Sequence, residues 1–112
     1  MNKTYHNRLE SLLKRAAPEI ISTHQLTFKN SFGAVAGYVD GHIFVSCGAF
    51  GVALRLPPDT LTELFQEADV APLRYFPKGH IKKEYAVIPQ RIVDDPRRFK
   101  ELLDQSIQHA LA

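Results

Sequence analysis

The segment from residue 74 to residue 85 holds the side chains of this sequence that are best suited to bind a charged ligand. Its basic members are Arg74, Lys78, His80, Lys82 and Lys83, and its aromatic members are Tyr75, Phe76 and Tyr85. Basic groups contact phosphates and aromatic rings stack on bases, so the segment is a candidate nucleic-acid or anion site. The alternative is a solvated loop between two strands, with its aromatic rings turned inward. Four further basic residues would enlarge the site if the fold brought them alongside: Arg91, Arg97, Arg98 and Lys100.

Cys47 is the residue that an enzymatic function would need. It is the single cysteine of the chain, and it lies in a segment with the composition of a strand. A catalytic thiol requires a histidine close in space, whereas a free cysteine is commonly a buried core residue. We expect a buried Cys47 and no catalytic residue, with a small thiol-dependent enzyme centred on Cys47 as the alternative.

The other polar residues predict neither a metal site nor a cofactor site. The histidines are scattered along the chain, without the short paired spacing of a zinc site. Asp94 and Asp95 precede Pro96, where they suit the start of a helix better than acid–base chemistry. The glycines lack the order of strand, glycine-rich loop and helix that a phosphate-binding loop requires.

The elements that position these residues follow from the spacing of the apolar side chains. A helical period runs from residue 5 to residue 20, and Pro18 is expected to end or restart that helix near residue 17. Two strands, 34–39 and 42–47, flank Asp40-Gly41, a pair that favours the type I′ turn of a hairpin.

The later elements complete an α+β pattern. They are a third strand over 52–56, a short helix behind a capping box at Thr60-Leu61-Thr62-Glu63, an extended piece over 73–76, a strand over 84–88 and a final amphipathic helix that Asp95 and Pro96 begin. The order predicts a two-layer sandwich, with an antiparallel sheet of about five strands and helices packed on it.

Composition indicates one ordinary globular domain over residues 1–112. Hydrophobic residues make up 45% of the chain and charged residues 23%, and the net charge of +2 does not demand a polyanionic partner. No stretch has the length and apolarity of a membrane span, and the start lacks the apolar run of a secretory signal. With a single cysteine, the chain suits a reducing compartment, so we expect a cytoplasmic protein.

Residues 31–46 carry a resemblance to a known family. They read S-F-G-A-V-A-G-Y-V-D-G-H-I-F-V-S, which resembles the opening signature of the TfoX/Sxy N-terminal domain family. The signature residues present here are Phe32, Gly33, Gly37, Asp40, Gly41 and Phe44. The resemblance implies a two-layer sandwich similar to secretion-chaperone-like domains, with no catalytic residues. It also implies kinship with bacterial competence regulators, which cooperate with a transcription activator and normally carry a second, C-terminal helical domain.

We therefore expect a stand-alone, non-enzymatic regulatory or protein-interaction domain with an unidentified protein partner. A weak nucleic-acid or anion binder acting through loop 78–83 is the alternative from another class. Sequence-specific DNA binding is not expected of the isolated chain. The few basic groups at Lys78, Lys82 and Lys83 predict at most weak association that is lost as salt rises.

Three consecutive apolar residues, Ile43, Phe44 and Val45, predict a homodimer. A strand of an antiparallel sheet with one solvated face normally alternates apolar and polar residues. A strand that is apolar on both faces needs a cover on each, and a second copy could supply one of them. The alternative is that the helices or the segment 18–31 cover both faces.

Overall fold

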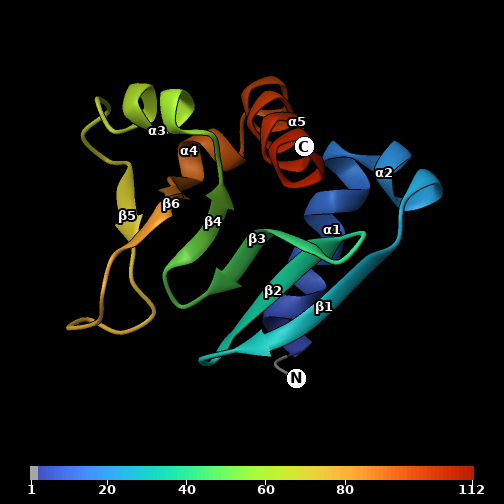
Figure 1. Cartoon of the computed structure of the whole chain (residues 1–112), viewed down its shortest axis with the longest axis horizontal. Coiled ribbons are helices and arrows are strands. Elements are labelled where there is room, and N and C mark those ends of the chain that lie inside the picture. Colours follow the sequence, from blue (N-terminus) through green and yellow to red (C-terminus); the bar gives the residue numbers. More distant parts are fainter. Residues whose placement is uncertain (1–2) are drawn as a thin grey trace.

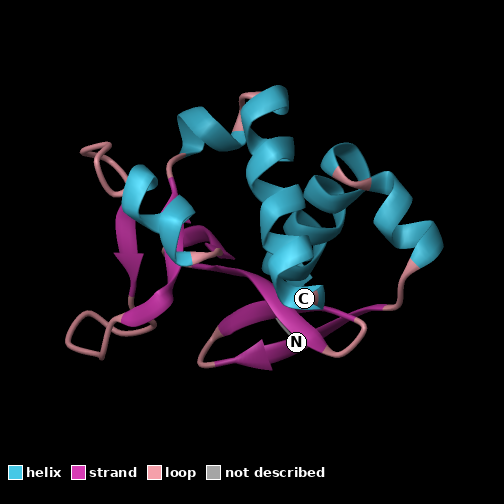
Figure 2. Cartoon of the chain, turned by 45° about the horizontal axis from the view of Figure 1, so that its top comes forward, coloured by secondary structure: helices cyan, strands magenta, loops and turns pink. Residues whose placement is uncertain are grey.

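An antiparallel sheet of six strands carries the helices on one of its faces (Figures 1 and 2). The computed structural model describes residues 3–112, apart from the side chain of Ser31. The strands are β1 (Leu26–Ser31), β2 (Ala34–Val39), β3 (His42–Gly48), β4 (Gly51–Arg55), β5 (Ala71–Leu73) and β6 (Lys82–Ile88), in the spatial order β1-β2-β3-β4-β6-β5. The helices are α1 (Lys3–Ala16), α2 (Pro18–Thr23), α3 (Pro58–Leu64), α4 (Gln90–Val93) and α5 (Pro96–Leu111). The α+β sandwich is confirmed.

The two long helices bury one apolar stripe each against the sheet. α1 contributes Leu9, Leu12 and Leu13, and the buried face of α5 runs from Phe99 to Ala110. The predicted break at Pro18 is confirmed, because α1 ends at Ala16 and α2 begins at Pro18. Within residues 3–112, no helix is long and apolar enough to cross a membrane.

The Asp95 cap is confirmed as well. Its carboxylate oxygen Oδ1 accepts a hydrogen bond from the backbone N–H of Arg98 at 3.2 Å, and Pro96 occupies the first turn of α5. A side-chain acceptor satisfies an amide that the helix itself leaves without a partner, and proline is preset for the first helical position. Local sequence therefore fixes where the last helix begins.

Two hairpin turns of the same type join the first three strands. Asp40 and Gly41 have φ values of 49° and 84°, as the predicted type I′ turn requires. The carboxylate Oδ1 of Asp40 also accepts a hydrogen bond from the N–H of Gln25 at 2.9 Å. Phe32 and Gly33, with φ values of 52° and 80°, form an equivalent turn between β1 and β2.

A β-bulge explains the three consecutive apolar residues of β3. Gly37 pairs with Val45 and Tyr38 pairs with Ile43, so Phe44 is an extra residue without a partner opposite. A Cβ at Gly37 would lie 2.7 Å from Val45 Cγ1 and 3.7 Å from Phe44 Cε1, so both side chains lie on the helix side. The run of apolar residues thus comes from the bulge, and it does not require a second cover over the strand.

The bulge also explains a buried serine on α5. Ser106 is fully buried, and its hydroxyl donates a hydrogen bond of 2.7 Å to the carbonyl oxygen of Phe44. A bulge takes backbone groups out of the regular ladder, and a buried carbonyl without a partner is costly. The helix supplies the missing donor.

Three details of the sequence prediction are wrong. The sheet has six strands because β1 precedes the predicted hairpin, and the short helix α4 was not expected. The capping box is absent because α3 begins at Pro58, which places Thr60 inside the helix. The hydroxyl of Thr60 donates instead to Gln105 Oε1 on α5, at 2.7 Å. Proline in the first turn is a sufficient start signal without a capping side chain.

Candidate functional site

The face of the sheet opposite the helices, here called the loop face, is lined by small side chains. Ala36, Ser46 and Ala53 are fully buried and stand side by side on β2, β3 and β4. The alanines lie outside the main core, which is formed with the helices. A different part of the chain must therefore cover this face.

Two aromatic rings provide that cover. The hydroxyls of Tyr75 and Ser46 lie 3.3 Å apart, so the segment after β5 reaches across the sheet. The ring of Phe50 packs edge-to-face on the ring of Tyr75, with 5.7 Å between the ring centroids. A Cβ at Gly48 would lie 2.8 Å from the ring of Phe50 and 2.9 Å from the Cβ of Ala34. Position 48 thus needs glycine for the ring of Phe50 to sit on the sheet.

Four aromatic residues surround a surface hollow of about 440 Å³, here called the aromatic hollow. They are Phe32, Phe50, Tyr75 and Phe76, which come from the β1–β2 turn, the β3–β4 turn and the segment after β5. The ring centroid of Phe32 lies 5.5 Å from that of Tyr75 and 5.9 Å from that of Phe76. Phe32 is 65% exposed and Phe76 is 56% exposed, whereas Phe50 and Tyr75 are half-buried. The rim is therefore apolar and open to solvent.

Two of the five basic residues predicted as a site lie at this hollow. Arg74 lines it directly, and the ammonium of Lys82 lies 5.9 Å from the centroid of the Tyr75 ring. Lys78, His80 and Lys83 are exposed on the same segment. None of the five pairs with a carboxylate in the part of the chain that the structure describes.

Neither sequence interpretation of segment 74–85 describes it completely. Tyr75 turns toward the sheet and Tyr85 is a half-buried residue of β6, so these two rings are turned inward as the solvated-loop alternative expects, while Phe76 and the basic side chains stay exposed. Burial raises the pKa of Tyr85 to about 12, and the nearby hydroxyl of Tyr75 adds to the shift. Tyr85 is therefore neutral at physiological pH.

The small net charge of the chain conceals an uneven distribution. The strands and their loops, residues 24–57 and 70–89, carry six basic and two acidic side chains, a net charge of +4. The remaining, mainly helical residues carry eight basic and ten acidic side chains, a net charge of −2. The sheet layer and the helical layer therefore carry net charges of opposite sign.

The four basic residues of the last two helices do not enlarge the basic site, because each pairs with an acidic residue. Arg97 pairs with Glu101, and Lys100 pairs with Glu19 and Asp104.

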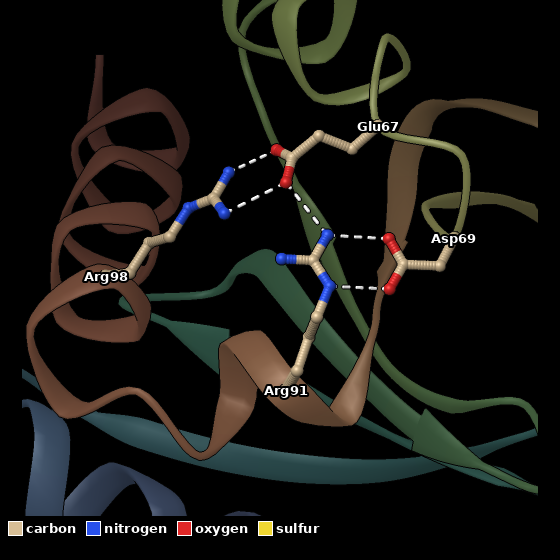
Figure 3. Close-up of polar contacts among 4 residues, drawn as sticks. All are labelled: Glu67, Asp69, Arg91 and Arg98. Carbon is tan, nitrogen blue, oxygen red and sulfur yellow. Dashed lines mark hydrogen bonds and ion pairs between the residues drawn. The ribbon is translucent and has the colours of Figure 1, made fainter.

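Figure 3 shows the partners of Arg91 and Arg98. Arg91 binds Asp69 through two hydrogen bonds of 2.6 Å and reaches Glu67 Oε1 at 2.8 Å. Arg98 binds both oxygens of Glu67. These hydrogen bonds, that of Arg98 foremost, lower the pKa of Glu67 to about 2. The cluster ties the α3–β5 connection to α4 and α5, which gives it a structural role.

Cys47 does not have the surroundings of a nucleophile. It is fully buried, so the interpretation of Cys47 as a core residue is confirmed. Burial raises the pKa of its thiol, an effect that the nearby guanidinium of Arg8 opposes only in part. A protonated, inaccessible thiol reacts slowly. Among residues 3–112, no three His, Cys, Asp or Glu side chains are grouped so that they could hold a metal ion.

The signature residues lie at turns and at the bulge. Phe32-Gly33 and Asp40-Gly41 form the two turns with positive φ. Gly37 on β2 and Phe44 on β3 lie at the bulge, on paired strands. Phe32 also forms part of the aromatic hollow. The sequence analysis missed Phe50, whose signal was its place in a short turn directly after Gly48.

A comparison with models of protein families gives a match over most of the chain. The model of the TfoX N-terminal domain family matches residues 21–110. Comparisons with curated proteins and with solved structures found no match.

Proposed function

Because this chain belongs to the TfoX N-terminal domain family, we propose that it is a non-enzymatic regulatory domain that acts by binding another protein. The exposed rim of the aromatic hollow is the observation that carries this proposal. Phe32 and Phe76 leave large apolar rings in water at adjacent positions. Contiguous exposed apolar groups of this kind are typical of interaction surfaces.

The state of Cys47 supports the non-enzymatic part of the proposal. The alternative, a thiol-dependent enzyme, needs an accessible thiolate, and the thiol of Cys47 is buried with a raised pKa. A regulatory domain needs only a stable scaffold and an exposed surface, both of which the fold provides.

Affinity capture from extracts of the cells that make the protein tests this proposal. The wild type is compared with a Phe32→Asn/Phe76→Ser double variant, and with Phe65→Ser as a control. Phe65 is an exposed aromatic residue at the end of α3, away from the hollow. We expect a protein that wild type and control retain and the double variant loses. Equal capture by all three would contradict a binding role for the hollow.

Weak binding of nucleic acid or another polyanion is a second candidate function. The observation in its favour is that Arg74 lines the aromatic hollow and Lys82 lies over the ring of Tyr75, while neither has a carboxylate partner among residues 3–112. Such binding would not depend on base sequence and would weaken steeply with salt. Fluorescence anisotropy with duplexes of different sequence measures both properties.

A homodimer remains a separate proposal, now supported by a different feature. Among the strands of residues 3–112, β1 pairs with β2 alone and forms one edge of the sheet. An edge strand has backbone groups free to pair with a second chain. Light scattering at micromolar concentration is expected to show twice the 12.6 kDa chain mass, and a species of the chain mass alone would exclude the dimer.

A further inference from the structure

We propose that the aromatic hollow binds an acidic segment of a partner protein, with one large apolar side chain of that segment inserted into the hollow. This inference rests on the proposed function, since it names the chemistry of the partner that the domain would bind. It depends on three observations: the shape of the hollow, the backbone of Phe32 and the distribution of charge.

The shape of the hollow suits a single large side chain. Its volume is about 440 Å³, and its lining is more apolar than polar. Its walls come from three separate segments of the chain, and the small residues Gly33, Ala34 and Ala49 also line it. A peptide side chain that enters such a hollow gains apolar contacts on several sides, as buried anchors of protein interfaces do.

Phe32 has a conformation that folding alone does not favour. Its φ of 52° is in the left-handed region, which is unfavourable for a bulky side chain and favourable for Asn, Asp or Gly. The ring is also 65% exposed. The backbone cost is only matched by the contacts of the ring with Tyr75 and Phe76, and the exposed ring gains little from burial, so phenylalanine brings no net stability at this position. A contact made only in a complex would account for phenylalanine at this position.

Charge selects an acidic partner. Arg74 lines the hollow, Lys82 lies over Tyr75, and Lys78 and Lys83 stand exposed on the same segment. The acidic residue nearest to them in the sequence, Glu84, is already bound to Arg55. Complementary charge increases the association rate and disfavours wrong partners. The net negative charge of the helical part of the molecule would direct an acidic segment toward this face.

A single-stranded nucleic acid fits these features less well. Binding of a strand requires basic groups along a groove that follows several phosphates, and rings on which successive bases stack. Here the unpaired basic groups beside the hollow belong to one segment, 74–83. The rings pack tilted or edge-to-face against one another and form walls rather than a row of platforms.

Fluorescence anisotropy with labelled probes tests the inference on the full chain. The first probe is a short peptide in which aspartates and glutamates flank a central phenylalanine. The second has glutamines and asparagines in place of the acids, and the third has serine in place of the phenylalanine. The fourth is a single-stranded thymidine oligonucleotide. We expect the first probe to bind at least about tenfold more tightly than each of the others.

Matched variants assign the binding to the hollow and its rim. Phe32→Asn keeps a residue type that accepts the left-handed turn, so it removes the ring without opposing the fold. We expect Phe32→Asn and Lys78→Glu/Lys82→Glu each to weaken binding of the first probe about tenfold or more. Phe65→Ser and Lys14→Glu, which alter an aromatic and a basic residue on the helical side, should leave it unchanged.

Each contrary result has its own meaning. Equal binding of the uncharged peptide would overturn the acidic partner while leaving the protein-binding function intact. Binding of no peptide, together with cellular capture that depends on Phe32 and Phe76, would overturn this inference alone. Tighter binding of the oligonucleotide, with displacement of the first peptide, would assign the hollow to nucleic acid.

Discussion

The two faces of the sheet are covered in different ways. On the helix side, Phe44 and large aliphatic residues of the strands are fully buried under α1 and α5. On the loop face, alanines and Ser46 are buried by the rings of Phe50 and Tyr75, each itself half-buried. The helices α1 and α5 provide most of the apolar burial that stabilises the fold. On the loop face, where two rings form the cover, the aromatic rings at the rim of the hollow stay exposed to solvent and available for binding.

The largest expected difference between the faces lies in their aromatic residues. Phe44→Ala should lower the free energy of unfolding by about 3–5 kcal/mol, because it leaves a cavity in the core. Phe50→Ala should cost about 2 kcal/mol, since the half-buried ring removes less area from water. Urea denaturation of both variants measures the difference. Equal losses would show that the loop face contributes as much to stability as the helix side.

A pair of buried serines gives a smaller contrast. Ser106→Ala would leave the carbonyl of Phe44 without its donor, at a cost of about 1–3 kcal/mol. Ser46→Ala should cost about 0.5 kcal/mol, because the 3.3 Å contact is longer and half-buried Tyr75 can bond to water instead. Chemical denaturation of the two variants checks the order, and a larger loss for Ser46→Ala would contradict it.

Acid and alkali should destabilise the two regions separately. The pKa of Glu67 is lowered from 4.5 to about 2, so its ion pairs stabilise the fold above pH 4.5, and this stabilisation is lost as the pH falls toward 2. The pKa of Tyr85 is raised from 10.0 to about 12, so its contribution is complete below pH 10 and is lost as the pH rises to 12.

Two variants test which residue causes the loss of stability at each end of the pH range. Glu67→Gln should lower the free energy of unfolding by on the order of 1 kcal/mol near neutral pH, as expected for a partly exposed ion-pair network. It should also reduce the loss of stability between pH 4.5 and pH 2. Tyr85→Phe should reduce only the loss of stability between pH 10 and pH 12. Thermal unfolding at a series of pH values measures both effects. If Glu67→Gln lost stability in acid as the wild type does, the ion pairs of Glu67 would not be the cause of that loss.

The smallest expected effect on stability belongs to Phe32→Asn. Relief of the left-handed backbone, about 1 kcal/mol, opposes the loss of two ring contacts of similar total size. We expect a net change within about 1 kcal/mol, again by denaturation. A loss as large as that of Phe44→Ala would make Phe32 a core residue and remove the argument for a binding role.

Most elements of the fold could be predicted because their signals are local. Asp40-Gly41 specifies its turn by accepting positive φ, and Asp95-Pro96 starts α5 through one hydrogen bond and a preset φ. β1 had no such signal at its end, because the turn after it contains Phe32, a residue type that rarely adopts this conformation. The strand was missed for that reason.

The candidate site could be predicted only in part. The basic segment was visible because Arg74, Lys78, His80, Lys82 and Lys83 are close in sequence. The hollow was not, because Phe32, Phe50 and Tyr75 are far apart in the chain and meet only when the segment after β5 folds across the sheet. The neutralisation of Arg91 and Arg98 likewise depends on Glu67 and Asp69, more than twenty positions away.

The sequence by itself determined the two long helices, the hairpin around Asp40-Gly41, the family resemblance and the location of the basic segment. Each of these depends on residues within a few positions of one another, through backbone conformation or periodic spacing. Only the tertiary structure decided the bulge at Phe44, its hydrogen bond to Ser106 and the grouping of rings around the hollow. These features depend on strand register and on contacts between distant segments, and register is set by the packing of the whole sheet.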